Sequence, residues 1–247
     1  MRSLANLSRF VGRISVSGTK LTCLIIALLL TSTTAGADTC IAPDNGSNTV
    51  DLPPSACAYY GPMLIIDGLP PGSTIGIQAK FDDFQFHFDC GGGAGTLGGE
   101  RICVDVRLPL TMTGTGAYSS FFYETVLYGF MEIHTAPRVP GTDSFDTALF
   151  HMESGHSGDF HFSHLDVAIG DGLGFPSPGH TDLDELPGGE FNVDSFFDIT
   201  YRINFTGAPG GELAGLSGTT IGTSHISLGE PYTATAGSNW SLVKVRY

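Results

Sequence analysis

The segment from His151 to His164 holds the densest group of side chains that could do chemistry. Histidine and carboxylate groups are common ligands of zinc and copper, and the candidate ligands here are His151, Glu153, His156, His161, His164 and Asp166. Their spacing matches no metal motif such as His-Glu-x-x-His. On a strand, His161 and His164 would point to opposite faces and could share a metal ion only across a bulge. The pattern favours histidines on a solvent-facing surface, with a zinc or copper site as the alternative.

Acidic side chains further along the chain form a second candidate site, for calcium. Its first members are Asp182, Asp184 and Glu185. Calcium takes about six to eight oxygen ligands, which acidic loops can supply. The helix–loop–helix calcium pattern is absent, because Leu186 occupies a position that needs an oxygen ligand. We expect solvated carboxylates that keep an apolar-rich protein in solution, with a weak extracellular calcium site as the alternative.

Motifs for hydrolysis give weaker signals. A glycosidase needs two acids at a set separation across a cleft, but the chain has 25 acidic residues and the sequence singles out no pair. The aromatic residues that follow Asp82-Asp83 are Phe84, Phe86 and Phe88. We interpret them as core, because platforms for sugars are usually exposed Trp or Tyr. No Gly-x-Ser-x-Gly elbow is present. A secreted metal- or carboxylate-dependent hydrolase that uses His151–His164 is therefore an alternative hypothesis.

The first 37 residues have the features of a secretory signal peptide. An apolar run over 21–30 is followed by a polar stretch that ends Ala35-Gly36-Ala37, which suits a signal peptidase. The run is about half the ~20 residues that a membrane-spanning helix needs. The basic residues before it are Arg2, Arg9, Arg13 and Lys20. We expect cleavage after Ala37 and release of a secreted, extracellular or periplasmic protein.

Export gives the remaining cysteines a structural role. The expected mature chain keeps Cys40, Cys57, Cys90 and Cys103, and an even number in an oxidising compartment indicates two disulfides. Pairing of neighbours, Cys40 with Cys57 and Cys90 with Cys103, closes the shortest loops, although the other connectivities stay open. A zinc site is the rival interpretation, and no Cys-x-x-Cys spacing supports it.

Charge and composition limit the partners. The whole chain has 11 basic and 25 acidic residues, for a formal net charge of −14. Removal of the four basic residues of 1–37 would leave 7 against 25, or about −18. A surface that binds nucleic acid needs clustered Lys and Arg, so we expect no nucleic-acid partner. The 34 glycines and the charged fraction of only 15% argue against a helical bundle.

Hydrophobic residues alternate with polar ones along most of the body, which predicts strands with one buried face. The clearest runs are 101–112 and 197–206, and within 74–88 the alternation changes at Phe81-Asp82-Asp83-Phe84, which predicts a bulge. Pro- and Gly-rich turns separate the runs. We therefore predict an all-β fold after the signal peptide: an antiparallel β-sandwich or jelly-roll-like domain of about 9–11 strands. The weaker runs are 63–67, 122–135, 146–153, 159–169, 218–228 and 239–247.

The sequence features above predict the domain boundaries and a function. We predict a disulfide-tied N-terminal segment over 38–62 and a single all-β domain over 63–247. The predicted function is an exported, non-catalytic binding or structural module with an acidic surface, which contacts glycans, cell-surface material or matrix proteins with assistance from calcium. Loops on a rigid scaffold would make the contact, and the segment Gly170–Gly189 is the expected loop.

A final strand over 239–247 that ends at Tyr247 supports a second alternative, a small outer-membrane β-barrel. The two expected disulfides count against it, several strands are shorter than the ~9–11 residues that such a barrel needs, and Asn239 and Ser241 interrupt the apolar face. We therefore expect no membrane insertion, and an ordinary closing strand of a sheet at this position.

Overall fold

The computed structural model describes residues 40–87, 90, 93–138 and 144–229. The predicted signal peptide, with its cleavage site, and the predicted last strand over 239–247 lie outside the described residues. The described chain is almost entirely antiparallel β-structure, with two short 3-10 turns, η1 (Gly116–Tyr118) and η2 (Asp171–Leu173). The eleven strands of these residues are β1 (Cys40–Pro43), β2 (Tyr59–Tyr60), β3 (Leu64–Ile66), β4 (Ile75–Phe86), β5 (Arg101–Gly114), β6 (Phe122–Thr135), β7 (Ser144–His156), β8 (Phe162–Ile169), β9 (Pro178–Glu185), β10 (Glu190–Gly207) and β11 (Ser217–Leu228).

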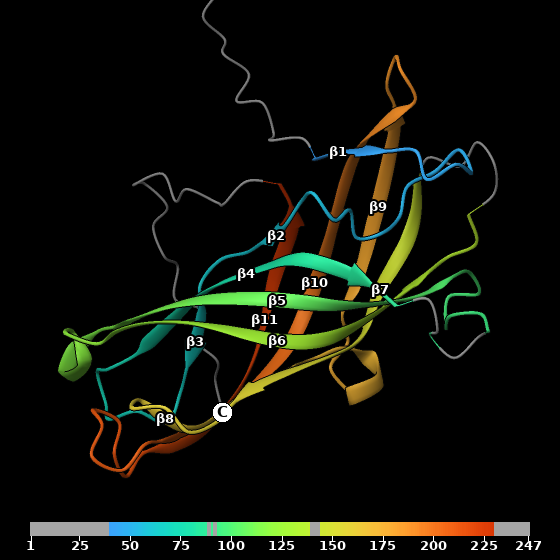
Figure 1. The fold of residues 1–247 in the computed structure, drawn as a ribbon. Helices are drawn as coiled ribbons and strands as arrows, with labels where there is room; N and C mark the ends of the chain where they lie inside the picture. The colour runs from blue at the N-terminus through green and yellow to red at the C-terminus, as the bar shows by residue number, and fades with distance from the viewer. Residues whose placement is uncertain (1–39, 88–89, 91–92, 139–143, 230–247) are drawn as a thin grey trace, which may run out of the picture. The chain divides into compact units, whose positions relative to one another are not determined.

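The strands pair in an order that returns on itself. β4, β5, β6 and β7 are consecutive antiparallel neighbours. β7 then pairs with both β9 and β8, and each of these pairs with the long strand β10. From β10 the pairing continues through β11 and β2 back to β4. In Figure 1 the ribbons of β4, β5 and β6 run across those of β9, β10 and β11, as in sandwiches whose two layers cross at a large angle. The prediction of an all-β, sandwich-like fold is confirmed.

One apolar core fills the space between the layers. Along β10 the alternate residues from Phe191 to Phe205 are buried, and β5 alternates in the same way from Val104 to Met112. Aromatic rings connect the layers: Tyr59 of β2 lies 5.3 Å from Phe197 of β10, measured between ring centroids. The predicted period of two is confirmed on both strands, so the opposite face of each strand is directed outward.

The predicted bulge in β4 is present. Asp82 pairs with Arg107 but Gln85 pairs with Asp105, so β4 has one residue more than β5 over this stretch. Asp83 absorbs the extra residue with a φ of 53°, in the left-handed region that Asn and Asp tolerate best. The bulge lets Phe81 and Phe84 both face the core while Asp82 stays on the outer face.

The two predicted disulfides are present, and the connectivity that the sequence left open is that of neighbours in sequence. Cys40 is joined to Cys57 and Cys90 to Cys103. The first bridge links β1 to the residues just before β2. β1 pairs with β10, and β2 pairs with both β11 and β4. Residues 40–60 therefore contribute strands to the same sheet as the rest of the described chain.

The prediction of a contact loop over Gly170–Gly189 is wrong for the second half of that segment. Residues Pro178–Glu185 form β9, which pairs with β7 on one side and with β10 on the other. The sequence pattern of β9 is hard to recognise, because only Thr181 and Leu183 are buried and so the alternation of buried and exposed residues is short. Many glycines and prolines also flank the strand. A Cβ at Gly179 would lie only 2.2 Å from the main-chain oxygen of Phe196. Glycine at this position therefore allows β9 and β10 to approach closely, rather than making a loop flexible.

Candidate functional site

The six candidate metal ligands of the His151–Asp166 segment separate into three places. On β7, His151 lies 3.5 Å from the carboxylate of Glu153. At the end of β7, His156 contacts Asp159 of the following turn at 3.0 Å, and just before β8 the ring of His161 packs on Tyr123 with 4.4 Å between centroids. On β8, His164 lies 2.6 Å from Asp166.

No arrangement for a metal ion is formed by these residues. Among all described residues, no group of three or more His, Cys, Asp or Glu side chains is placed to hold one. The acidic residues proposed for calcium, Asp182, Asp184 and Glu185, are exposed residues on β9. Asp182 lies opposite Asp194 of β10 in the strand pairing. A calcium ion at these positions would need oxygen ligands from a bound partner.

Histidine–carboxylate pairs recur over the whole described surface. Seven of the eight histidines lie within 3.5 Å of an Asp or Glu oxygen, His161 being the exception. Four pairs join residues two apart on one strand, as in His164 and Asp166. Side chains at i and i+2 of a strand share a face, so the sequence pattern of a histidine and an acid separated by one residue could have identified these pairs.

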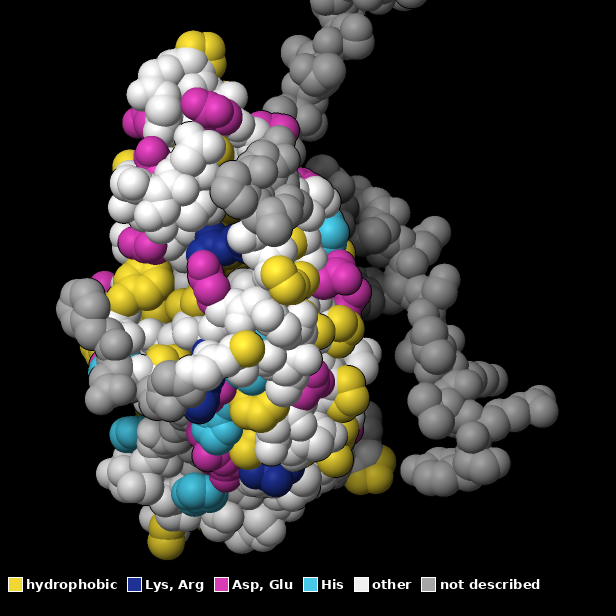
Figure 2. All heavy atoms as spheres, turned by 90° about the vertical axis from the view of Figure 1, so that its right-hand side faces the viewer, with side chains coloured by type: hydrophobic (Ala, Val, Ile, Leu, Met, Phe, Trp, Pro, Cys, Tyr) yellow, Lys and Arg dark blue, Asp and Glu magenta, His cyan; other side chains and the backbone are white. Residues whose placement is uncertain are grey.

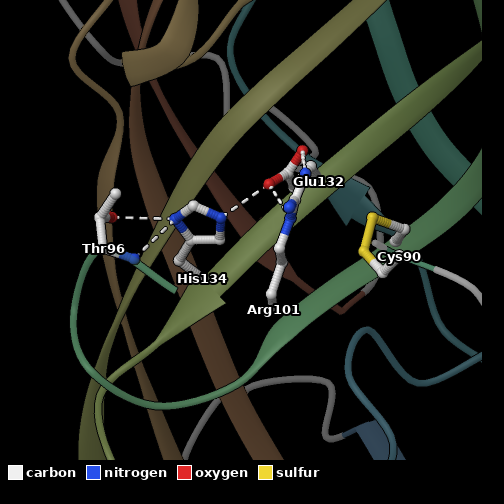
Figure 3. Close-up of polar contacts among 6 residues, drawn as sticks. Cys90, Thr96, Arg101, Glu132 and His134 are labelled. Atoms are coloured by element: carbon white, nitrogen blue, oxygen red, sulfur yellow. Dashed lines mark hydrogen bonds and ion pairs between the residues drawn. A yellow bond between two sulfur atoms is a disulfide. The ribbon is translucent and has the colours of Figure 1, made fainter. Parts of the chain in front are cut away.

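The most buried pair belongs to a network that contacts the glycine-rich segment 93–100, between Cys90 and β5 (Figure 3). Glu132 and His134 of β6 are both buried. The main-chain N–H of Thr96 donates to Nδ1 of His134 at 3.1 Å, so Nε2 carries the proton and donates to Glu132 at 2.8 Å. Arg101 donates to the other oxygen of Glu132 at 3.1 Å. Burial raises the pKa of Glu132, but the hydrogen bonds from Arg101 and His134 outweigh it and hold that pKa below its ordinary value.

This network is a structural clasp rather than a catalytic triad. The hydroxyl of Thr96 lies 2.9 Å from Nδ1 of His134, which is a triad-like distance. However, Nδ1 already accepts the main-chain N–H of Thr96, so its lone pair is not available to take the hydroxyl proton. The ring of Phe150 also stacks on His134 at 4.3 Å between centroids. The clasp therefore fastens the loop that the Cys90–Cys103 disulfide closes.

A second polar arrangement crosses the outer face of the sheet in a single row. Asp82 of β4 pairs with Arg107 of β5, and Arg107 pairs with Tyr128 of β6. The Gly129–Ser154 pair places Tyr128 opposite Gly155 of β7. Continuing the row, Gly155 pairs with Asp166 of β8 and Asp166 with Asn204 of β10. Because opposed residues of neighbouring strands share a face, the row from β4 to β10 is continuous.

Three adjoining hollows follow this row, and we call them together the outer groove. The first, of about 680 Å³, includes Lys80, Asp82 and Arg107. The second, of about 370 Å³, shares Arg107 with the first and reaches Tyr128. The third, of about 440 Å³, shares Tyr128 with the second and continues over β7, β8 and β10. The third hollow is also lined by Glu153, Gly155, Asp166, Arg202 and Asn204.

Ion pairs fix the first end of the outer groove. The guanidinium of Arg107 donates to both oxygens of Asp82 at 2.9 Å, and Nζ of Lys80 lies 2.8 Å from Asp82. Burial raises the pKa of Asp82, but these hydrogen bonds lower it by more, so the pKa lies below its ordinary value. The carboxylate therefore stays charged and offsets one of the two positive charges beside it.

A hydrogen-bond network fixes the other end. Asp166 accepts from the amide of Asn204 at 2.8 Å and contacts His164 at 2.6 Å. The hydroxyl of Thr219 donates to Asn204 at 2.8 Å, and Arg202 lies 3.9 Å from Asp166. The planar groups at this end are therefore held in one orientation by their neighbours.

The middle of the outer groove combines an exposed ring with a low floor. Tyr128 is 71% exposed, the largest exposed fraction among the exposed large hydrophobic side chains of the described chain. Opposite it, Gly155 puts no side chain on the floor; a Cβ there would lie 3.3 Å from the main-chain oxygen of Leu165 and 3.5 Å from the Cβ of Asp166. Sequence reasoning missed Tyr128, since the alternation of β6 is weak and its outer positions include other large apolar residues.

On the face turned to the viewer in Figure 2, dark-blue cationic side chains lie beside magenta acidic ones. The ion pairs of the described residues agree, since Lys80, Arg101, Arg107, Arg138 and Arg202 each have an acidic partner within 4.0 Å. These five are the Lys and Arg residues of the described ranges. The surface therefore presents no unpaired cationic patch over those ranges.

Comparison with known proteins adds no relative. No protein-family model matches this chain, and no curated protein or solved structure is significantly similar to it. Within the described residues, no helix has the length and hydrophobicity to cross a bilayer. The function is therefore argued from the site itself.

Proposed function

We propose that this protein is an exported, non-catalytic binding module that contacts glycans or cell-surface material through its outer groove. The observation that carries the proposal is the outer groove itself: one row of fixed polar groups, with an exposed tyrosine at its centre, on a rigid sheet. Binding surfaces of this kind depend on groups that are already oriented before the ligand arrives. The two disulfides suit an oxidising compartment, and with the predicted signal peptide they support export.

Binding is favoured over hydrolysis by the state of the groove carboxylates. A general acid must hold a proton near neutral pH, which usually requires an apolar environment that raises its pKa. Asp82 has the opposite environment, because two cations lower its pKa. Asp166 is bonded to an amide and to His164. A carboxylate with a lowered pKa, such as that of Asp82, is suited to accepting hydrogen bonds rather than to donating a proton to a leaving group.

The test is a binding experiment with protein purified from the exported fraction. Its N-terminal sequence should begin at Asp38, and the protein should be retained by cell-wall or extracellular-matrix preparations. A parallel assay of reducing ends released from the same material should stay at the background rate, whereas turnover would favour the hydrolase. Repeating the binding with EDTA and then with added calcium tests the proposed role of Asp182, Asp184 and Glu185. Failure of the protein to bind any such preparation would contradict the proposal.

A further inference from the structure

We infer that the outer groove binds a linear, uncharged polysaccharide, with Tyr128 stacking on one sugar ring and the polar groups at both ends bonding hydroxyls of neighbouring rings. This inference rests on the proposed function and names its ligand class. It depends on four properties of the groove, which are its length, its central ring, its fixed hydrogen-bonding groups and its charge.

The length of the outer groove fits a chain rather than a small molecule. The row from β4 to β10 crosses six adjacent strands, which at ~4.8 Å per strand spacing gives about 24 Å. The first and second hollows both border Arg107, and the second and third both border Tyr128. A ligand that occupies all of them must therefore be extended and must repeat its chemistry along its length.

The central ring fits the apolar face of a sugar. Tyr128 presents a flat, largely exposed ring, and such rings supply a large contact area at a low cost in conformational entropy. Its phenol group adds a donor and acceptor at the rim of the ring. A ligand over Tyr128 also passes over Gly155, where the missing side chain lets it approach the sheet.

The polar groups on both sides of the ring match vicinal hydroxyls, which donate and accept at once. Lys80 and Arg107, whose side chains are 37% and 39% exposed, keep N–H donors beyond their contacts with Asp82. Asp166 keeps free lone pairs, and Asn204 keeps one N–H. Each is held by its neighbours, so little side-chain entropy is lost when a ligand binds. Planar groups with this mixture of donors and acceptors suit a polyol better than an apolar ligand.

The charge of the outer groove disfavours polyanions. Its acidic side chains outnumber its cationic ones, Lys80, Arg107 and Arg202, and each of these cations already has a carboxylate partner. An anionic chain would meet repulsion from the excess carboxylates. The acidic side chains are Asp82, Asp83, Asp105, Glu153 and Asp166.

The pairing of the strands disfavours an extended peptide. A peptide that adds to a sheet needs an edge with unpaired main-chain groups. β5, β6 and β7 form the middle of the groove floor, and each is paired on both sides. Main-chain recognition is therefore not offered there, and contact depends on side chains.

Affinity electrophoresis of the exported protein through gels that contain one polysaccharide each tests the inference. The neutral probes are a soluble β-glucan, a mannan and a hydroxyethyl cellulose, and the anionic probes are alginate and hyaluronate. At least one neutral probe should retard the wild-type protein, and the anionic probes should not. Titration calorimetry with an oligosaccharide of the retarding probe then gives the dissociation constant.

Two variants and one control locate the ligand. Tyr128→Ala should weaken binding by about tenfold or more, the effect of losing a central aromatic contact. Gly155→Val should weaken it to a similar extent because its side chain occupies the floor; the backbone of Gly155 is not in the left-handed region. Phe122→Ala is the matched control, since Phe122 is also an exposed aromatic on β6, at 59%, but does not line the outer groove. Its affinity should equal that of the wild type.

The outcomes separate the ligand class from the site. Retardation by anionic probes alone, or retention by a protein component of the matrix alone, would overturn the inference and leave the proposed binding function in place. Binding to a neutral probe that neither Tyr128→Ala nor Gly155→Val weakens would overturn the groove as the site. Failure to bind any probe or any cell-surface preparation would overturn both. Thermal melting of each variant checks that the fold is retained.

Discussion

Replacement of Asp82 by Asn should destabilise the protein by about 1–2 kcal/mol at neutral pH. Asp82 is buried and accepts two bonds from Arg107 at 2.9 Å, with Lys80 at 2.8 Å. If such a charged hydrogen bond were fully buried, it would contribute roughly 1.5–3 kcal/mol to the free energy of unfolding. The side chains of Arg107 and Lys80 are 39% and 37% exposed, so solvent screening reduces each contact to about 0.5 kcal/mol. Three reduced contacts give the stated total, and the Asn oxygen recovers part of one.

The effect should depend on pH with a definite sign. The folded-state pKa of Asp82 is lowered, so its stabilising contribution is fully present above the unfolded value of about 3.9 and is lost as pH falls through the lower folded value. The wild-type protein and the Asp82→Asn variant should therefore differ at about pH 7 and approach each other in stability near pH 2. Other carboxylates with lowered pKa values, such as Glu132, titrate in both proteins and cancel in the difference.

The assay is urea unfolding followed by fluorescence, with the disulfides intact. A loss of 1–2 kcal/mol corresponds to a midpoint lower by roughly 0.5–1 M, for a slope of about 2 kcal/mol per M. Asp83→Asn is the matched control: it makes the same charge change at the neighbouring residue, which is exposed and has a backbone that Asn tolerates. It should change stability by less than about 0.5 kcal/mol. An Asp82→Asn effect that is equal at both pH values, or an equal effect of Asp83→Asn, would refute the electrostatic reasoning.

Three further predictions concern stability and use the same unfolding assay. The double substitution Cys90→Ser and Cys103→Ser opens a loop of 13 residues and should lower the free energy of unfolding by about 3 kcal/mol. An unchanged urea midpoint would show that the contacts of Glu132 and His134 alone close the loop. Tyr59→Phe removes the buried 2.9 Å bond to Ser195 and should cost about 1 kcal/mol; no loss would mean that this hydroxyl gains nothing from its partner. Gly170→Ala should cost about 2 kcal/mol or more, since its φ is 118° and a Cβ would lie 2.5 Å from a main-chain oxygen of β7; wild-type stability would contradict the close approach.

The sequence by itself determined the fold class and much of the core. The alternation of 101–112 and 197–206 predicted which faces of β5 and β10 are buried, and the break at Asp82-Asp83 predicted the bulge of β4. These features are local, because side chains alternate along any strand whatever lies beside it. The even number of cysteines predicted two disulfides, but their connectivity was decided by the structure.

Only the tertiary structure decided which outward side chains meet. Asp82, Tyr128 and Asp166 come from three parts of the chain, and their place in one row depends on the register of every pairing between β4 and β8. The same register kept His151, His156 and His164 apart, although they are close in sequence. A shift of one residue in any pairing would turn a side chain to the opposite face. Alternation within a strand cannot specify that register, which comes from packing across the whole sandwich.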